Sequence, residues 1–426
     1  MDYSHSDRSI EFQQRTTDFM RECIYPAESI FEEQATANRA AGTPFRTPDV
    51  MTDLKLEAKR RNLWNLFMPD ERYGPGLSVA EYAPIAEITG WSPNIAPEAL
   101  NCYAPDTGNM ELIAMFGTEE QRDRWLEPLL EAESRSCFSM TEPAVASSDA
   151  TNMQTTILPD GDEYVVNGRK WWSTGAMRPE CKVAIVMGLS MPDAPKHARH
   201  SMILVPLDAA GVTVERSTNV FGYDDGPHGG HAIISFRDVR VPRRNLLGSL
   251  GGGFMMAQAR LGPGRIHHCM RSIGIAERAL QLMCQRVRSR APFGQPLADQ
   301  GVIQQWMAES RLAIMQARLL VLNAAWRIDT TGASSARSEI SAIKVAAPRA
   351  ASYVVDRAIQ AHGGAGVSGE TPLAALWAYV RTIHIADGPD EVHLRALARR
   401  EMDQTRAVDP LAGGVGGPAV DAVAAR

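Results

Sequence analysis

The stretch Thr155-Thr156-Ile157-Leu158-Pro159-Asp160-Gly161-Asp162-Glu163-Tyr164-Val165-Val166 decides the fold class of this chain. Two short segments rich in β-branched residues flank a turn of Pro, Asp and Gly, the residue types that favour chain reversal. Gly161 tolerates the positive φ that such turns require. The stretch therefore predicts a β-hairpin whose loop is Pro159-Asp160-Gly161-Asp162.

Further segments of the same kind follow the hairpin, with no helical period between them. Each is short, apolar or β-branched, and bounded by Gly, Pro or Asp: Cys181 to Met187, Met202 to Val205, Val212 to Glu215 and Ala232 to Val241. Strands in series without intervening helices predict a small β-barrel or β-sandwich. We place this central β domain at residues 136–247.

The chain before the strands has helical periodicity. Apolar residues recur three or four positions apart, for example at Leu54, Ala58, Leu63 and Leu66. This pattern predicts an N-terminal α-helical domain at residues 1–135. Thr118 and Gln121 have capping-box spacing, which predicts the start of its last helix.

The helical period returns after the strands and predicts a C-terminal helical domain at residues 248–405. Long helical segments are expected around Phe254 to Ser289, Val302 to Asp329, Ala336 to Ala361 and Ala374 to Ile385. Pro263 and Gly264 predict a kink or break in the first of them. The small-residue-rich tail at 406–426 is expected to be disordered.

Size, charge and cysteine usage narrow the class of protein. A chain of 426 residues exceeds one ordinary core, so two or three domains are expected. A net charge of -6, with acids and bases mixed, argues against nucleic acid or an anionic membrane as the main partner. Six scattered cysteines without a Cys-x-x-Cys pair indicate free thiols in a reducing compartment. A polar start from Met1 to Ile10 and no long apolar run predict a soluble, cytoplasmic protein without a signal peptide.

Several segments near the junctions of the three parts resemble motifs of one enzyme family. In chain order they are Phe116-Gly117-Thr118-Glu119-Glu120-Gln121, Phe138-Ser139-Met140-Thr141-Glu142-Pro143, Asn167-Gly168-Arg169-Lys170-Trp171-Trp172-Ser173-Thr174, Arg290-Ala291-Pro292-Phe293-Gly294 and Gln360-Ala361-His362-Gly363-Gly364. Together they resemble the acyl-CoA dehydrogenase family over nearly the whole chain. Leu261-Gly262-Pro263-Gly264-Arg265-Ile266-His267-His268 resembles the branch that contains family members 10 and 11. The resemblance implies an α+β fold with an N-terminal helical domain, a central β-barrel or sandwich and a C-terminal four-helix bundle.

This resemblance also implies an activity. Such an enzyme uses FAD to oxidise an acyl-CoA to its 2,3-enoyl-CoA in fatty acid β-oxidation, and an electron-transfer flavoprotein accepts the electrons. A homotetramer or a homodimer is expected. The reaction removes a proton from the α-carbon and a hydride from the β-carbon, so it needs a base that faces the flavin across the substrate.

Asp387, within Ile385-Ala386-Asp387-Gly388-Pro389-Asp390-Glu391, stands where the family carries its catalytic Glu. The resemblance therefore assigns Asp387 as the base, although an acid beside Gly388-Pro389 also suits an ordinary helix start. Some members carry the base at the position that Gly264 occupies here, and Gly264 has no side chain. Asp is one methylene shorter than Glu, so the backbone or the substrate must lie closer. We expect water exclusion by the substrate to raise the pKa of Asp387 against the lowering effect of a helix start.

The resemblance assigns FAD contacts to two groups of residues. A first group, from the β domain, would hold the flavin ring and pyrophosphate: Phe138, Met140, Thr141, Ser147, Ser148, Trp172, Ser173 and Thr174. A second group would reach the FAD of a neighbouring subunit: Arg290, Phe293, Gln360, Gly363 and Gly364. Pro389 and Glu391 complete the set. Taken alone, Trp172 also suits a β-domain core, and the two threonines also suit strand ends.

Substrate contacts are implied for Ser148, Arg265 and Gly388, with Arg265 at the CoA portion. An Arg that binds helix carbonyls beside Pro263 is the alternative. No metal site is expected, because His267 and His268 are adjacent and point to different helix faces. The loop His228-Gly229-Gly230-His231 suits either a substrate entrance or a plain β connection.

Two competing functions stay open on sequence alone. Nitroalkane oxidase also resembles this family and uses an Asp base, so a nitroalkane is the alternative substrate. A non-catalytic flavin-binding protein of the same fold, as in a DNA-associated branch, is the other. The acidic balance of the chain argues against the DNA-associated alternative.

Overall fold

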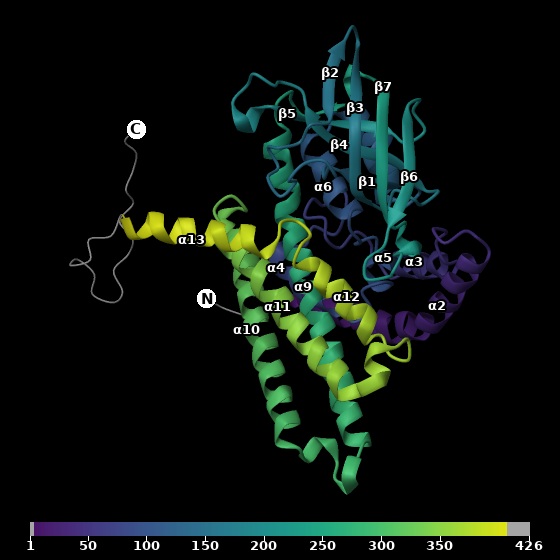
Figure 1. The fold of residues 1–426 in the computed structure, drawn as a ribbon, viewed down its shortest axis with the longest axis vertical. Coiled ribbons are helices and arrows are strands. Elements are labelled where there is room, and N and C mark those ends of the chain that lie inside the picture. Colours follow the sequence, from purple (N-terminus) through teal and green to yellow (C-terminus); the bar gives the residue numbers. More distant parts are fainter. Residues whose placement is uncertain (1–3, 407–426) are drawn as a thin grey trace.

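The computed structural model describes residues 4–406 of the chain. Its elements follow the order helices, strands, helices, with the sheet at one end of the molecule and the long helices at the other (Figure 1). The α+β class with a central β part is confirmed. The predicted disordered tail lies outside the described residues, except for Arg406, which ends the last helix.

The N-terminal part is helical, as expected. Its helices are α1 Asp7–Phe19, α2 Tyr25–Ala40, α3 Val50–Arg60, α4 Val79–Thr89, α5 Ala96–Ala99, α6 Asp106–Phe116, α7 Glu119–Gln121 and α8 Glu127–Leu130. The predicted capping box at the start of α7 is confirmed, because the Gln121 N–H donates to Thr118 Oγ1 at 3.2 Å and the Thr118 N–H donates to Gln121 Oε1 at 3.1 Å.

Eight strands form one mixed sheet in the order β6-β7-β3-β2-β4-β5-β8, with β1 paired to β4. They are β1 Arg135–Ser139, β2 Thr156–Asp160, β3 Glu163–Thr174, β4 Cys181–Leu189, β5 His200–Pro206, β6 Val212–Thr218, β7 His231–Pro242 and β8 Leu246–Leu247. The predicted hairpin is β2–β3, but its loop is shorter than expected. Only Gly161, at φ 57°, and Asp162 lie between the strands, since Pro159 and Asp160 belong to β2.

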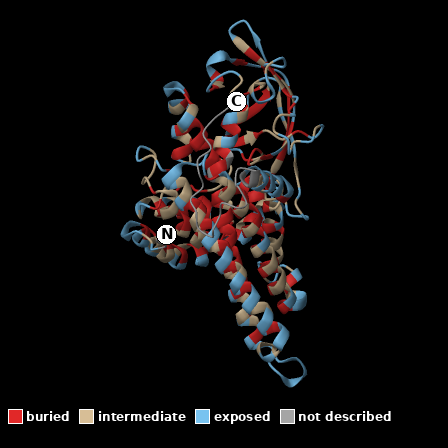
Figure 2. Ribbon diagram, turned by 90° about the vertical axis from the view of Figure 1, so that its left-hand side faces the viewer, coloured by how far each residue is buried: buried red, intermediate tan, exposed pale blue. Residues whose placement is uncertain are grey.

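Strand β4 is buried on both faces, which explains its continuous apolar run. Val183, Ile185 and Met187 join the large core that the helices share, whereas Ala184 and Val186 join a smaller core. That smaller core takes side chains from β1 to β5 and from β7, so the sheet encloses it in the manner of a barrel or sandwich. Figure 2 shows the buried residues gathered where sheet and helices meet.

The C-terminal part consists of α9 Gly253–Ser289, α10 Gly301–Thr331, α11 Arg337–His362, α12 Leu373–Ile383 and α13 Asp390–Arg406. Helix α9 is central, since it packs against α4, α6, α10 and α11. It continues through Pro263 and Gly264, so the expectation of a break there is wrong. This packing on several sides offsets the one backbone hydrogen bond that a proline removes. None of the helices in residues 4–406 has both the length and the apolar character needed to cross a bilayer.

Candidate active site

Asp387 lies in the turn between α12 and α13. Its φ is 56° and that of Gly388 is 102°, so two consecutive residues adopt left-handed backbone conformations. The Asp387 carbonyl accepts hydrogen bonds from Arg265 Nε at 3.0 Å and from His393 Nε2 at 3.3 Å. Burial lowers the pKa of His393 to about 4, so its ring is neutral near pH 7. These two donors hold a peptide conformation that a non-glycine residue adopts only at a cost.

The vacant position Gly264 faces the Asp387 carboxylate across a short gap. A Cβ placed on Gly264 would lie 4.0 Å from Asp387 Oδ2. A Cβ at 264 would therefore be in ordinary van der Waals contact with the carboxylate oxygen. The glycine thus lets the short Asp387 side chain lie against α9.

Positive charge surrounds Asp387. Burial opposes its charged form, but the nearby cations Arg260, Arg265 and Lys344 favour it, so the pKa of Asp387 lies below its ordinary value. Asp387 is therefore an ionised carboxylate at neutral pH in the protein without substrate.

His268 contacts the same carboxylate, with Nε2 3.6 Å from Asp387 Oδ2. Burial lowers the pKa of His268 to about 4, although Asp387 acts to raise it, so the ring is neutral near pH 7. His267 faces elsewhere, as expected for its neighbour on a helix, and meets the rings of Tyr82 and Phe67 at 5.1 and 6.1 Å. The sequence motifs point to His268 only as a possible metal ligand and do not predict this contact. Its spacing of four residues from Gly264 was the available signal.

Trp172 presents an open aromatic surface on the β part. It adopts φ 55° and is 40% exposed, with the His231 ring 5.4 Å away. Thr174 Oγ1 lies 2.9 Å from His231 Nδ1, and Trp171 Nε1 is a buried donor without a partner in residues 4–406. An uncovered indole beside a hydroxyl and an unpaired N–H fits a flat heteroaromatic ring such as that of a flavin.

The remaining residues of the first group differ in their access to a ligand. Ser148 is exposed and Thr141 is half-buried. Ser173 is buried and its hydroxyl bonds Ser139 Oγ at 2.9 Å, while the Ser147 hydroxyl meets the Glu142 N–H and carbonyl at 3.0 and 3.1 Å. The Met140 carbonyl accepts from Lys170 Nζ at 2.8 Å. The side chains of Ser147 and Ser173 are thus used within the protein, which leaves only their backbone for a cofactor.

Phe138 connects the β part with the surroundings of Asp387. The Arg260 guanidinium lies 4.0 Å from the centre of the Phe138 ring, and its Nε donates to Asn109 Oδ1 at 2.9 Å. Arg260 is buried, yet its contacts within residues 4–406 are neutral groups, with no carboxylate at ion-pair distance. No sequence motif had singled out Arg260.

The second group lies at the far end of the long helices, away from the sheet (Figure 1). Arg286 donates to the His362 carbonyl at 3.2 Å and so joins the ends of α9 and α11. Phe293 is fully exposed at φ 56°. Arg290, Gln360, Gly363 and Gly364 are exposed as well. Within one chain the structure does not bring this group to Trp172, whereas the half-buried Pro389 and exposed Glu391 flank Asp387 in sequence.

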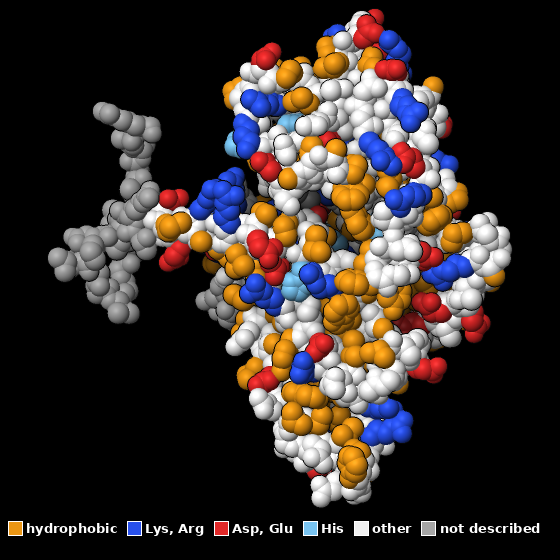
Figure 3. Space-filling model, viewed as in Figure 1, with side chains coloured by type: hydrophobic (Ala, Val, Ile, Leu, Met, Phe, Trp, Pro, Cys, Tyr) orange, Lys and Arg blue, Asp and Glu red, His pale blue; other side chains and the backbone are white. Residues whose placement is uncertain are grey.

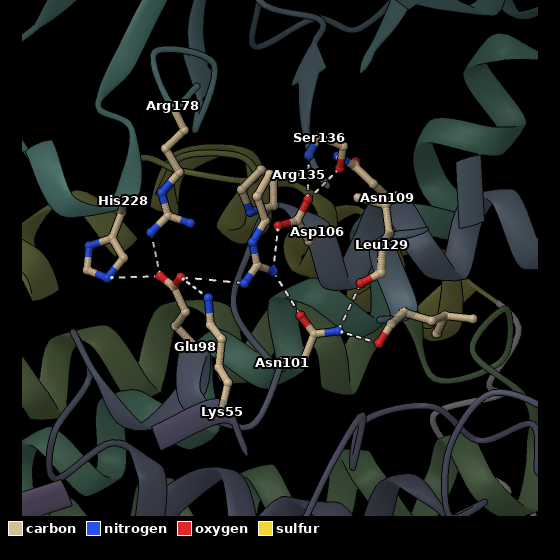
Figure 4. Close-up of polar contacts among 12 residues, drawn as sticks. Lys55, Glu98, Asn101, Asp106, Asn109, Leu129, Arg135, Ser136, Arg178 and His228 are labelled. Atoms are coloured by element: carbon tan, nitrogen blue, oxygen red, sulfur yellow. Dashed lines mark hydrogen bonds and ion pairs between the residues drawn. The ribbon is translucent and has the colours of Figure 1, made fainter. Parts of the chain in front are cut away.

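A second set of buried charges lies where the N-terminal helices meet the sheet (Figure 4). We call it the Glu98 cluster: Lys55, Glu98, Asn101, Asp106, Arg135, Ser136, Arg178 and His228. Glu98 meets Lys55 at 3.0 Å, Arg178 at 2.6 Å and Arg135 at 3.5 Å, and Arg135 also meets Asp106 at 3.2 Å. Because His228 is buried in this cluster, its loop has a structural role.

Comparison with known proteins places all three parts of the chain. Family models described as the N-terminal, middle and C-terminal domains of acyl-CoA dehydrogenase match residues 6–133, 137–239 and 251–402. The chain is 57% identical to the probable acyl-CoA dehydrogenase FadE2 of Mycobacterium tuberculosis over 95% of this chain and 98% of that protein. It is 51% identical to acyl-CoA dehydrogenase family member 11 of Rattus norvegicus, over 95% of this chain. The chain spans about half (52%) of that longer relative.

A solved structure has the same fold. The putative acyl-CoA dehydrogenase from Mycobacterium abscessus superposes with a TM-score of 0.91 and 49% identity, over 94% of this chain and 100% of that chain. The resemblance drawn from the sequence motifs, including the branch of member 11, is thereby confirmed.

Proposed function

Because the chain belongs to the acyl-CoA dehydrogenase family of oxidoreductases, we propose that it removes the α-proton and the β-hydride of an acyl-CoA thioester to form the 2,3-enoyl-CoA. Asp387 is the α-proton base in this proposal. One observation carries it: the Asp387 carboxylate is half-buried, lies near cations that lower its pKa and is turned toward Gly264 on α9. A side chain at 264 would begin in contact with this carboxylate, and this is where other members of the family are expected to carry the base.

FAD is the cofactor that the family and the open face of Trp172 support. Trp172 would cover the ring, Thr141 and Thr174 would bond its heteroatoms, and Ser148 would meet the pyrophosphate. When bound, FAD accepts the hydride from the β-carbon of the substrate. The tip formed by Arg290, Phe293, Gln360, Gly363 and Gly364 would hold the FAD of a neighbouring subunit, since it is exposed and far from Trp172 in its own chain.

The chain's own groups prepare the substrate for proton loss. The Asp387 N–H has no acceptor within residues 4–406, so it is available to the thioester carbonyl. A donor at that oxygen stabilises the charge that develops when the α-proton leaves. Arg265 and His393 bind the Asp387 carbonyl, which lies in the following peptide group, and so hold the turn on the C-terminal side of this N–H. Arg265 thus contributes by positioning the base, besides any contact with the CoA portion.

Assembly and electron transfer complete the proposal. Helix α10 exposes an apolar stripe, Leu312, Met315, Leu319 and Leu320, between 40% and 57% exposed. Figure 3 shows hydrophobic side chains spread over the helical half of one face. Such surfaces favour association of subunits, and we propose a homotetramer or homodimer. An electron-transfer flavoprotein is the acceptor expected for the family, and a role in β-oxidation in the cytoplasm stays a prediction.

An anaerobic flavin-bleaching screen over a panel of acyl-CoA esters tests the function. We expect at least one thioester to reduce the flavin and Asp387→Asn to slow that reduction by about 1000-fold or more while FAD stays bound. Asp208→Asn, at an exposed acid of the β5–β6 turn, is the matched control and should reduce normally.

The same screen separates the alternatives. Bleaching by a nitroalkane and by no thioester would identify a nitroalkane oxidase, which also suits an Asp base. Bound flavin that no substrate reduces would indicate a non-catalytic protein. Normal bleaching in Asp387→Asn would move the base to another residue.

A further inference from the structure

Two positions of α9, one turn apart, face the same oxygen of Asp387. The Cβ position of Gly264 is 4.0 Å from Oδ2, and Nε2 of His268 is 3.6 Å from Oδ2. Residues four apart on a helix share a face, so α9 presents an empty site and an imidazole side by side. The other carboxylate oxygen, Oδ1, has no hydrogen-bond partner within residues 4–406. Oδ2 is thus turned toward α9, and Oδ1 is left for a ligand.

The surroundings of His268 select one tautomer. Nδ1 is buried and has no partner within residues 4–406, whereas Nε2 lies beside the carboxylate. A proton on Nδ1 would leave a buried N–H unpaired and would set the Nε2 lone pair against a negative charge. The proton therefore belongs on Nε2, where it points to Oδ2.

We propose that His268 is a positioning residue for the base: its Nε2–H donates to Asp387 Oδ2 and so turns Oδ1 toward the α-carbon of the substrate. This inference rests on the proposed function of Asp387. The distance of 3.6 Å is long for a hydrogen bond in the protein without substrate, and contacts of this kind shorten in the substrate complex.

Asp387 needs a hydrogen bond that fixes its orientation more than the longer Glu of the family does. Rotation about the last torsion of a carboxylate is soft, so either oxygen of Asp387 can turn toward the substrate. A donor fixed on one oxygen removes this freedom, and placement of the reacting oxygen within about 1 Å can decide a factor of roughly 100 in rate. His268 thereby fixes the orientation of the shorter Asp387 side chain.

The proton transfer itself balances without another reactant. The α C–H bond breaks, its electron pair stays on the thioester, and an O–H bond forms at Oδ1. The charged groups that face His268 are Asp387, Arg260, Arg271 and Lys344, from the α12–α13 turn, α9 and α11. A neutral imidazole orients the carboxylate without adding another positive charge, which would weaken the base further.

Exchange of the substrate α-hydrogens tests His268 apart from the flavin. The probe is an acyl-CoA with sulfur at position 3, which can lose an α-proton but has no β C–H to transfer. Holoenzyme is incubated with the probe in D2O, and deuterium uptake is followed by mass spectrometry from pH 4 to pH 9. This range includes the acid limb once the bound probe excludes water from Asp387 and raises its pKa. We expect wild type to exchange and Asp387→Asn to lose exchange.

His268→Leu removes the donor, and His268→Gln keeps an N–H of similar reach. We expect exchange to slow about 30-fold in His268→Leu and less than about threefold in His268→Gln. The acid limb of the rate should move to higher pH in His268→Leu only, because loss of a donor to the charged form raises the pKa of Asp387. His267→Gln, on the adjacent residue, controls for the packing of α9 and should exchange as wild type.

The outcomes distinguish the two proposals. Exchange in His268→Leu at the wild-type rate and pH overturns the positioning role. So does an equal loss in His268→Leu and His268→Gln with an unmoved acid limb, or an equal loss in His267→Gln, since each indicates only helix packing. Wild-type exchange in Asp387→Asn overturns the proposed function instead.

Discussion

The Glu98 cluster and the surroundings of Asp387 are both groups of charged side chains where parts of the fold meet. They differ in how their acidic and basic side chains are paired. In the cluster, Glu98 and Asp106 meet Lys55, Arg135 and Arg178 at ion-pair distance (Figure 4). At Asp387 one carboxylate faces Arg260, Arg265 and Lys344, none of them at ion-pair distance from it within residues 4–406.

This difference distinguishes a cluster that stabilises the fold from a site that can bind a ligand. A charge whose partners are supplied by the chain itself can only hold the fold together, because no group remains for a ligand. Excess positive charge and a free carboxylate oxygen leave a site that a substrate or cofactor can complete. Asn109 joins the two regions, since it donates to Ser136 Oγ at 2.8 Å and accepts from Arg260 at 2.9 Å.

Breaking the completed cluster should have the largest effect on stability. Glu98→Gln leaves the buried Arg135 and Arg178 and the half-buried Lys55 without their shared carboxylate. We expect a loss of about 3–5 kcal/mol, seen as a clear fall in Tm by calorimetry at pH 7. An unchanged Tm would contradict the structural role.

Glu163→Gln is the matched control for this variant. It removes an acid from the exposed pair with Arg240 on the sheet, where the side chains are 52% and 41% exposed. Exposed pairs contribute little, so its Tm should stay within the error of the wild-type measurement.

Glu111, on α6, is a third buried acid, and it tests the effect of burial on a carboxylate. Its Oε2 is unpaired within residues 4–406, and burial raises its pKa to about 8, although Arg260 acts to lower it. Between pH 4.5 and 8 the folded state keeps a proton that the unfolded state loses, so stability falls as pH rises through this window.

Glu111→Gln should remove that dependence. We expect the variant to match wild type near pH 5 and to be more stable by roughly 3 kcal/mol near pH 8, measured as Tm against pH. A constant difference across the whole range would show that the Glu111 proton is not involved.

Arg260→Met should have a smaller effect on stability than Glu98→Gln or Glu111→Gln and a distinct effect on the base. Arg260 has no ion-pair partner in the described part of the chain, and Met keeps most of its apolar stem, so a change below about 1 kcal/mol is expected. Removal of a cation should raise the pKa of Asp387 and move the acid limb of α-hydrogen exchange upward by about half a pH unit. A stability loss as large as that of Glu98→Gln would contradict the difference between the Glu98 cluster and the surroundings of Asp387.

Local patterns in the sequence predicted much of this fold. The β2–β3 hairpin, the Thr118 capping box and the bounds of α9 to α12 follow from turn residues and periodicity within a few positions. Strand β1 escaped prediction because its partner β4 is distant in sequence and parallel to it. The continuity of α9 through Pro263 was not predicted for a related reason, since packing against other helices outweighs the helix-breaking tendency of proline.

The candidate site divides in the same way. Asp387, Trp172 and Thr174 could be named because they lie in motifs that resemble those of a known family. Arg260, Lys344 and His268 carry no motif, and their role depends on helices that approach Asp387 from elsewhere in the chain. The sequence also did not show whether a predicted cofactor contact uses the side chain of the residue or only its backbone, as the buried hydroxyl of Ser173 illustrates.

The sequence by itself determined the order of helices and strands and the identity of the one carboxylate at the α12–α13 turn, because both are written in local residue patterns. The tertiary structure alone decided that this carboxylate rests against Gly264 and His268, and that its charge is not cancelled while that of Glu98 is. The physical reason is that burial and charge depend on distances between segments that are far apart along the chain.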